Sequence, residues 1–429
     1  MNRRLIRHAG AILGVVAFVA STQWAAAETV TLTWTIFNNP NEVAIAGKLV
    51  EAFEAKNPDI KIEVDPIPAG GDGDNLVKTR LSTDDMSDLL WYNDGSLFHA
   101  LNPTKNFVDL TDETFQQGIL ESFKPVVTQD GHIYGVPLGT ALGGGVFYNR
   151  KVYEKLGLSV PKSWADFMAN NEKIKAAGIA PVIQTFGDPW TAQLFVLADY
   201  YNVQAAEPDF AQRYTNNQVK YASDPVALKG FERQEEVFKA GDLNPDFASA
   251  KFEDGLRMVA EGKGAHYPML SITVGTIAKN SPALVNDVGF FALPGDDAAK
   301  NGLTTWMPNA LYIYARTKHP DEAKRFVAFV ASKEGCDAQT AAIGATGPYL
   351  VKGCDLPADV PTAVSDLLPY FATEGTTAPA LEFISPIKGP NLPQITVEVG
   401  SGFRSAASGA ALYDEDVVKQ AQQLGLPGW

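Results

Sequence analysis

The first ninety residues alternate between strand-like and helix-like hydrophobic patterns. Apolar residues alternate with threonines over residues 30–36, which predicts a strand. Apolar residues then recur at helical spacing over 46–53, and a second alternating run covers 60–64. The order strand, helix, strand is typical of a doubly wound α/β lobe.

Polar residues follow two of these predicted strands where each one ends. Asn38 and Asn39 come after the first strand, and Asn93 and Asp94 come after an apolar strand that ends at Trp91. Ligands of open α/β sheets bind at the carboxyl ends of strands. Asn39 and Asp94 are therefore candidate ligand-binding residues.

Glycine-rich stretches elsewhere do not indicate a phosphate site. Gly143, Gly144 and Gly145 are followed by a strand pattern rather than by a Lys-Ser/Thr pair, so a phosphate-binding loop is excluded. The stretches 295–297 and 373–379 are expected to be surface turns.

The N-terminus has the pattern of a cleavable secretory signal peptide. Three arginines within residues 1–7 precede an apolar run over 9–20, and three alanines end at Ala27. The run is too short to span a bilayer. A lipid anchor would need a cysteine at the cleavage point, and the first cysteine is Cys336. We expect residues 1–27 to be removed and the mature protein to be soluble in a Gram-negative periplasm.

Length and charge narrow the class of protein. A chain of 429 residues exceeds what one hydrophobic core usually organises, so two lobes are expected. The net charge of −15 disfavours binding to nucleic acid or to anionic lipid. A neutral ligand is not affected by this charge.

Cys336 and Cys354 are the two cysteines of the sequence. Export into an oxidising compartment favours a disulfide between them, and a pair of buried free thiols is the alternative. The histidines after the signal peptide, His99, His132, His266 and His319, lack the spacing of metal ligands. We expect no metal and no cofactor.

A longer segment resembles a known family. It runs from Tyr134-Gly135-Val136-Pro137 through Tyr148-Asn149-Arg150, Gly157-Leu158 and Pro161 to Ser163-Trp164-Ala165-Asp166-Phe167. This segment resembles the bacterial extracellular solute-binding proteins of family 1, which include maltose-binding protein. In them a Gly-Val-Pro strand crosses between lobes ahead of Tyr-Asn-Lys and Pro-Lys-Thr-Trp stretches. Arg150 and Ser163 replace the usual Lys and Thr.

The resemblance implies a fold and a function. The fold is a two-lobed α/β periplasmic-binding-protein fold of type II, with a doubly wound sheet in each lobe and several hinge crossings. We expect an N-terminal lobe of residues 28–138 plus 309–348 and a C-terminal lobe of 139–308 plus 349–429. The implied function is non-catalytic. A monomeric receptor binds a mono-, di- or oligosaccharide between the lobes and delivers it to the inner-membrane permease of an ABC import system.

The resemblance also implies ligand contacts. Asp188-Pro189-Trp190 is similar to an acid-Pro-aromatic element that offers a carboxylate and a stacking ring. Trp91 and Asp94 resemble the aromatic and carboxylate of the opposite lobe. The loop from Asn38 to Glu42, including Asn39, matches the first ligand-facing loop. Pro268 to Ser271 stand where the family often has a tryptophan, so maltose specificity is not implied.

The chemistry of sugars supports the same set of residues independently. A sugar has C–H faces and hydroxyl edges, so its receptor needs flat aromatic rings beside polar groups. Trp91, Trp190, Trp306, Asp94 and Asp188 supply both kinds of group at loop positions.

Several of these residues also have a structural interpretation. Trp91 and Trp190 are candidates for the core, and Asp94 and Asp188 are candidates for helix caps. His266 and Tyr267 lie at the end of a predicted strand. They are candidates either for a pair of ligand-binding residues or for a buried, hydrogen-bonded pair. Trp164 is expected in the core, and Arg404 is a candidate either for a ligand contact or for a structural position.

Two other functions compete with a sugar receptor. A secreted carbohydrate-active enzyme needs two carboxylates about 5 to 10 Å apart, and the resemblance places Asp94 and Asp188 on opposite lobes. A receptor for a polyamine, a metal or an anion needs converging carboxylates, paired tyrosines or arginines, which the predicted ligand loops do not show.

Overall fold

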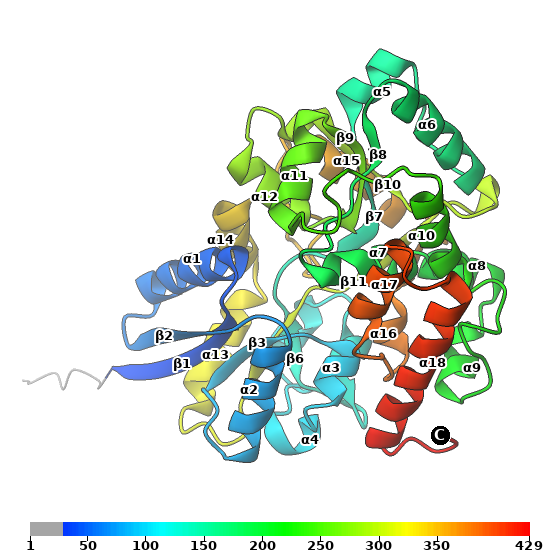
Figure 1. Cartoon of the computed structure of the whole chain (residues 1–429). Helices are drawn as coiled ribbons and strands as arrows, with labels where there is room; N and C mark the ends of the chain where they lie inside the picture. The colour runs from blue at the N-terminus through cyan, green and yellow to red at the C-terminus, as the bar shows by residue number, and fades with distance from the viewer. Residues whose placement is uncertain (1–28) are drawn as a thin grey trace, which may run out of the picture.

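The computed structural model describes residues 29–429, and the predicted signal peptide lies outside this range. Two β-sheets, each covered by helices, form two halves of the molecule (Figure 1). The first half contains the blue strands near the N-terminus, and the second contains the green ones. The chain therefore has the two-lobed α/β architecture expected from its sequence.

The first sheet has five strands. Their order is β2 (Ile60–Ile67), β1 (Val30–Phe37), β3 (Leu89–Tyr92), β12 (Ala310–Ile313) and β6 (Gly135–Pro137). The strand β1 runs parallel to β2 and to β3, whereas β12 runs antiparallel to both β3 and β6. The parallel part confirms the predicted strand, helix and strand at the start of the chain. A hairpin of β4 (Thr128–Gln129) and β5 (His132–Ile133) lies outside this sheet.

The second sheet is built around one long strand. Its members are β13 (Thr377–Pro379), β11 (Leu303–Trp306), β7 (Leu142–Asn149), β9 (Gly264–Leu270), β8 (Ala180–Val182) and β10 (Val288–Ala292). The strand β7 pairs antiparallel with β9, β10 and β11. Residues 377–379 are thus an edge strand parallel to β11 and correct the predicted surface turn.

Helices cover both sheets. Those that follow the strands of the first sheet are α1 (Pro40–Lys56), α2 (Gly71–Ser82), α3 (Gly95–His99), α4 (Pro103–Asn106), α13 (Pro320–Val330) and α14 (Lys333–Ile343). Those that follow the second sheet's strands are α5 (Arg150–Leu156), α6 (Trp164–Ala176), α7 (Leu194–Leu197), α8 (Tyr200–Ala206), α9 (Phe210–Thr215), α10 (Lys229–Lys239), α11 (Phe252–Glu261) and α12 (Thr273–Asn280), and then α15 (Thr362–Ala372), α16 (Leu381–Ile384), α17 (Leu392–Gly400) and α18 (Ala406–Gln423). Short 3₁₀ helices cover Thr114–Gly118, Lys124–Val127, Pro189–Gln193 (η3), Val285–Asp287 and Ala298–Lys300.

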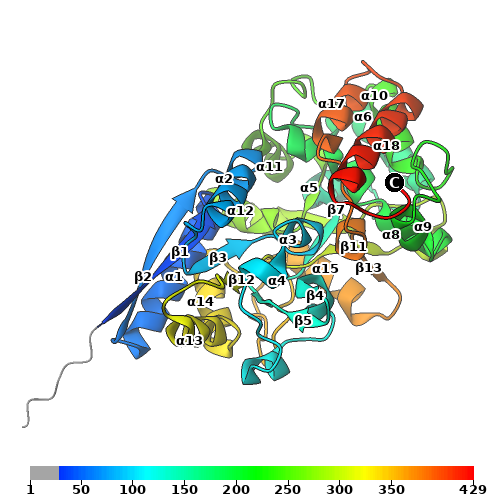
Figure 2. The same ribbon diagram turned by 90° about the horizontal axis from the view of Figure 1, so that it is seen from below.

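The chain crosses between the two sheets more than once. Residues 138–141 lead from β6 to β7, and residues 307–309 lead back from β11 to β12. A later connection leads from α14 to α15. Figure 2 shows the two halves from below, with the red C-terminal helices α17 and α18 beside the second one.

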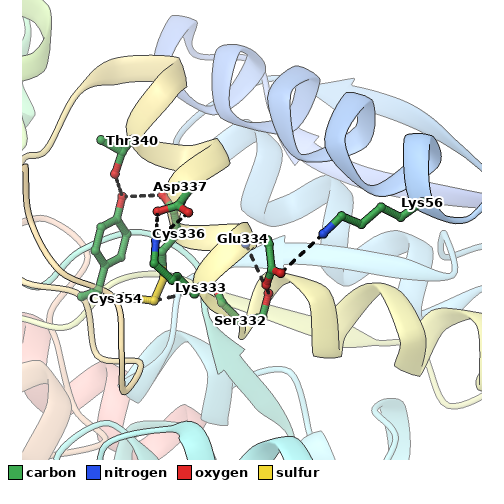
Figure 3. A network of polar contacts seen from close by, with 10 residues as sticks. Lys56, Ser332, Lys333, Glu334, Cys336, Asp337, Thr340 and Cys354 are labelled. Atoms are coloured by element: carbon green, nitrogen blue, oxygen red, sulfur yellow. Dashed lines mark hydrogen bonds and ion pairs between the residues drawn. A yellow bond between two sulfur atoms is a disulfide. The ribbon is translucent and has the colours of Figure 1, made fainter.

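The later connection is anchored by a disulfide between Cys336, on α14, and Cys354 (Figure 3). The disulfide confirms the pairing expected for an exported protein. Lys352 donates its backbone N–H to the Gly118 carbonyl at 2.7 Å, and Leu350 accepts from the backbone of Leu120 at 2.9 Å. The chain therefore stays attached to the first half of the molecule beyond the predicted boundary at 348/349.

Within residues 29–429, the helices are all too short or too polar to cross a bilayer.

Candidate functional site

A cavity of about 220 Å³ is lined by strand residues of the second sheet and by residues that flank the strands β3 and β12 of the first sheet. Of the residues predicted to contact a ligand, it brings together Asp94, Trp190 and Trp306. Its other lining residues are Asn93, Leu97, Leu142, Gln193, Leu194, Leu197, Leu270, Met307, Asn309, Glu382, Phe383 and Lys388. The cavity is thus mostly apolar, with a small group of polar side chains, as ligand pockets commonly are.

Asp94 lies at the carboxyl end of β3, as predicted. It occupies the N-cap position of α3, yet its side chain makes no capping hydrogen bond. Its exposed fraction is 5 %, and its Oδ2 has no hydrogen-bond partner within residues 29–429. Burial, with a smaller contribution from the negative charge of Glu382, raises the pKa of Asp94 well above its usual value. The pocket therefore holds a buried acceptor that the protein itself leaves unpaired.

Trp306 forms one wall of the cavity and is fixed from two sides. Its ring lies against β7 at Gly144, where an added Cβ would come within 2.2 Å of the ring atom Cζ3. Its Nε1 donates to Oε1 of Glu382 at 2.6 Å. The other carboxylate oxygen of Glu382 accepts from Lys388. The glycine run of β7 thus makes room for an aromatic ring, which explains a pattern that resembled a phosphate loop.

Trp190 is the most exposed aromatic residue of the cavity. Its exposed fraction is 42 %, and its ring contacts Phe252 at 5.1 Å between centroids. It lies on η3, which is followed along the chain by α7 and α8. An exposed indole at the edge of an apolar pocket is suited to stacking on a ligand.

Asp188 and Tyr267 hold the turn that carries Trp190 and are not among the lining residues. Asp188 accepts the backbone N–H of Phe252 at 2.8 Å, so it satisfies a free donor in the first turn of α11. Tyr267 is 1 % exposed and shares a 2.8 Å hydrogen bond with Thr185, which bonds Thr191 of η3. Both residues thus support Trp190 where direct ligand contact was predicted.

Trp91 lies in the core of the first half. It is 4 % exposed and stacks on Trp34 with ring centroids 6.0 Å apart. Trp91 is not among the lining residues of the cavity, so the structure shows the core position that the sequence offered as its alternative.

Asn39 and Glu42 cap the start of α1 and do not line the cavity. Asn39 accepts from the backbone of Glu42 at 2.9 Å, and Glu42 accepts from the Asn39 amide at 2.6 Å and from the Phe37 N–H at 3.1 Å. Burial raises the pKa of Glu42 to about 7. These reciprocal bonds use the polar groups that the sequence suggested for a ligand.

His266 is fully buried and is not among the lining residues of the cavity. Its Nε2 bonds the Tyr153 hydroxyl at 2.7 Å, and its ring packs on Phe167 at 4.8 Å between centroids. Burial lowers its pKa to about 3. The buried, hydrogen-bonded alternative is therefore the correct one for this residue.

The two residues outside the predicted ligand set occupy structural positions. Trp164 is buried and donates to Glu236 at 2.8 Å, as expected for a core residue. Arg404 bonds Glu398 at 2.7 Å and is not among the lining residues of the cavity.

Sequence reasoning missed the polar residues that the C-terminal segment contributes, Glu382 and Lys388. The only signal for them was an acidic and an aromatic residue side by side, Glu382-Phe383, between two prolines. They reach the cavity because α16 packs against α3, a contact between segments almost three hundred residues apart.

Known proteins share this architecture. The solved structure of a chitin oligosaccharide binding protein superposes with a TM-score of 0.79 at 20 % identity, covering 92 % of this chain and 99 % of that one. The protein RafE in complex with raffinose gives a TM-score of 0.76 at 22 % identity, covering 91 % and 100 %. Two lobes around a cavity lined from both halves of the molecule define the type II periplasmic-binding fold.

The sequence comparison gives the family. The sequence model of the family described as "Bacterial extracellular solute-binding protein" matches residues 39–335. The multiple sugar-binding protein of Streptococcus mutans is 27 % identical over 303 residues, which cover 69 % of this chain and 70 % of that protein. The chain belongs to the bacterial extracellular solute-binding proteins.

Proposed function

We propose that this chain is the receptor of an ABC import system and that it binds a neutral mono-, di- or oligosaccharide in the cavity around Asp94, Trp190 and Trp306. The observation that carries the proposal is Asp94, whose buried Oδ2 has no hydrogen-bond partner within the described chain, in a pocket with two indole rings. The rings suit the C–H faces of a sugar, and the carboxylate suits its hydroxyl donors. The relationship to a multiple sugar-binding protein supports the same ligand class.

The charges of the cavity favour a neutral ligand over an anion. Glu382 and Asp94 are acidic, and the single lysine among the lining residues, Lys388, is already paired with Glu382. An anion would have to compete with Glu382 for this lysine.

The receptor is proposed to act in a Gram-negative periplasm as a monomer and to pass its ligand to a membrane permease. The disulfide between Cys336 and Cys354 supports an oxidising compartment. The lobes are proposed to divide near residues 138 and 308, where the chain passes from one sheet to the other.

An enzymatic function is less well supported by the site. Asp188, one member of the carboxylate pair considered for glycoside hydrolysis, bonds the backbone of Phe252 and does not line the cavity. Glu382 lines it, but both of its oxygens accept hydrogen bonds from protein donors. Incubation with oligosaccharides is expected to yield no cleavage product.

Thermal-shift measurements test the proposed ligand class. Raffinose, lactose, maltose and chitin oligosaccharides would be compared with glycine, putrescine and phosphate. A ligand at about 100 times its Kd stabilises the folded protein by about 2.7 kcal/mol, which is a clear rise in melting temperature. We expect at least one sugar to produce this rise. A rise with glycine, putrescine or phosphate and with no sugar would contradict the proposal.

A further inference from the structure

Lys388 lines the cavity, but its contacts show that it does not present a free charge to a ligand. Its ammonium group pairs with Oε2 of Glu382, whose other oxygen accepts from Trp306 Nε1. The side chains of Lys388 and Glu382 are 25 % and 14 % exposed. An ion pair and a hydrogen bond therefore link Lys388, Glu382 and Trp306 in that order.

The backbone segment that carries the Glu382 side chain contacts both halves of the molecule. Ala380, just before α16, donates its N–H to the Thr305 carbonyl of β11 at 2.8 Å. On its other side, α16 packs on α3 at Gly95, where an added Cβ would come within 2.7 Å of the Glu382 carbonyl oxygen. Gly95 has a φ of +56°, which a glycine adopts without strain.

The Trp306 ring has a support beneath it and a hydrogen bond at its edge. Gly144 lets the indole lie directly on β7, and this contact limits movement of the ring toward the strand. Rotation of the ring within its plane would break the bond from Nε1 to Glu382. The direction of the Glu382 carboxylate therefore decides which part of the indole faces the cavity.

We propose that Lys388 is a positioning residue of the ligand site, which acts through Glu382 to fix the Trp306 indole as a stacking wall. Removal of the ammonium group leaves Glu382 without its charged partner and free to turn toward water. Trp306 then loses a fixed acceptor, and Asp94 faces a negative charge that Lys388 no longer balances. The inference rests on the proposed carbohydrate site and names the residue that organises it.

Substitution of Lys388 with two different residues separates its charge from its shape. Lys388→Met keeps the length of the stem and removes the charge, whereas Lys388→Arg keeps the charge. The affinity would be measured by calorimetry with the sugar that gives the largest thermal shift in the panel above. We expect Lys388→Met to weaken binding about tenfold, the usual effect of losing a hydrogen bond to a charged group, and Lys388→Arg to restore most of it. The matched control, Lys419→Met, changes an exposed lysine on α18 outside the cavity and should leave the affinity unchanged.

A second measurement needs no ligand. The near-ultraviolet circular dichroism of the wild type minus that of Trp306→Phe isolates the signal of this indole. The same difference in the Lys388→Met background should be markedly smaller, because the ring has lost its fixed orientation. The melting temperatures of the Lys388 variants should remain within a few degrees of the wild type.

The two measurements fail in different ways. If no sugar binds the wild type, the proposed function is wrong, and the Trp306 signal alone still decides whether Lys388 positions the ring. If Lys388→Met leaves both the affinity and the Trp306 signal unchanged, Lys388 is not a positioning residue. The loss of affinity caused by Lys388→Met should be smaller in the Trp306→Phe background than in the wild type. An equally large loss in both backgrounds would also overturn the proposal, because the effect of Lys388 would then not pass through the Trp306 ring.

Discussion

At the level of single residues, Trp190 and Trp91 differ in their exposure, which separates a role in binding from a role in folding. Trp190→Ala removes a ring that is 42 % exposed at the edge of the cavity. We expect the affinity for a sugar to fall roughly five- to thirtyfold, since losing an aromatic stacking contact costs about 1 to 2 kcal/mol. The free energy of unfolding without ligand should change by less than about 1.5 kcal/mol. Calorimetry and denaturant unfolding measure the two quantities.

Trp91→Ala is the matched control for this prediction. Trp91 is buried on Trp34, so its removal leaves a cavity and should lower the free energy of unfolding by about 3 to 5 kcal/mol. The affinity of the protein that remains folded should be nearly unchanged. The opposite result, with Trp190 critical for folding and Trp91 for binding, would show that Trp190 has a structural role and does not contact the ligand.

Asp94 makes binding depend on pH. Its pKa is raised in the ligand-free protein, and sugar hydroxyls that donate to it favour the ionised form and so lower that pKa in the complex. Binding therefore releases a proton, and the affinity falls as the pH is lowered through the raised pKa. Calorimetry in two buffers with different ionisation enthalpies measures the released proton.

The variant Asp94→Asn provides the control for this pH effect. It should bind more weakly than the wild type at high pH and lose the proton release. An affinity of the wild type that is constant from acidic to neutral pH would show that the carboxylate does not change its protonation on binding.

The sequence indicated Asp94, Trp190 and Trp306 because their position after strands or at turns already places them near a sheet edge. Asn39 and Glu42 were also predicted to contact a ligand, and the structure shows them capping α1, because a polar loop residue next to a helix can satisfy the free backbone donors of that helix. Glu382 could not be found from local pattern, since its role depends on contacts with Trp306 and Lys388 that only the folded chain creates.

At the level of elements, the glycines of β7 test how the strand supports the site. Gly144→Ala would place a Cβ about 2 Å from the Trp306 ring, far closer than real contacts, so the indole must move. Its bond to Glu382 should break, and sugar affinity should fall about tenfold or more. Calorimetry on the folded variant measures this loss.

A glycine in open space gives the control. Gly47 is an exposed position of α1 with nothing within 4 Å of an added Cβ. Gly47→Ala should leave the affinity unchanged and raise the free energy of unfolding by about 0.5 to 1 kcal/mol, because alanine favours a helix. If Gly144→Ala binds sugar as well as Gly47→Ala does, the contact between strand and ring is not needed.

The elements themselves were largely predictable where hydrophobic periodicity was strong. The strands β1 and β2 and the helix α1 follow directly from alternating and helical patterns. The edge strand β13 was predicted as a turn, because three residues offer no period, and its pairing with β11 is a long-range contact. The glycine-rich part of β7 likewise carries no hydrophobic signal.

At the level of the whole molecule, a cavity lined from both halves of the chain implies a change of shape on binding. A ligand that contacts both halves favours the conformation in which they are close, by the difference between its two affinities. Small-angle scattering should therefore show a smaller radius of gyration with saturating sugar than without it. Identical radii in the two samples would indicate that the halves do not move.

The two-lobed plan was predictable from length and family resemblance, whereas the attachment of residues 350–352 to the first half was not.

The position of β12 has a consequence for biosynthesis. This strand lies between β3 and β6 in the first sheet, although it follows β6 by more than 170 residues. At about 5 to 20 residues per second, the ribosome needs roughly 10 to 35 seconds to make this stretch. During that time β3 and β6 both lack the neighbour they share, and an unpaired edge is prone to associate with other chains. The first sheet therefore cannot be completed before β12 has been synthesised, so we expect the nascent chain to be prone to association with other chains until that point.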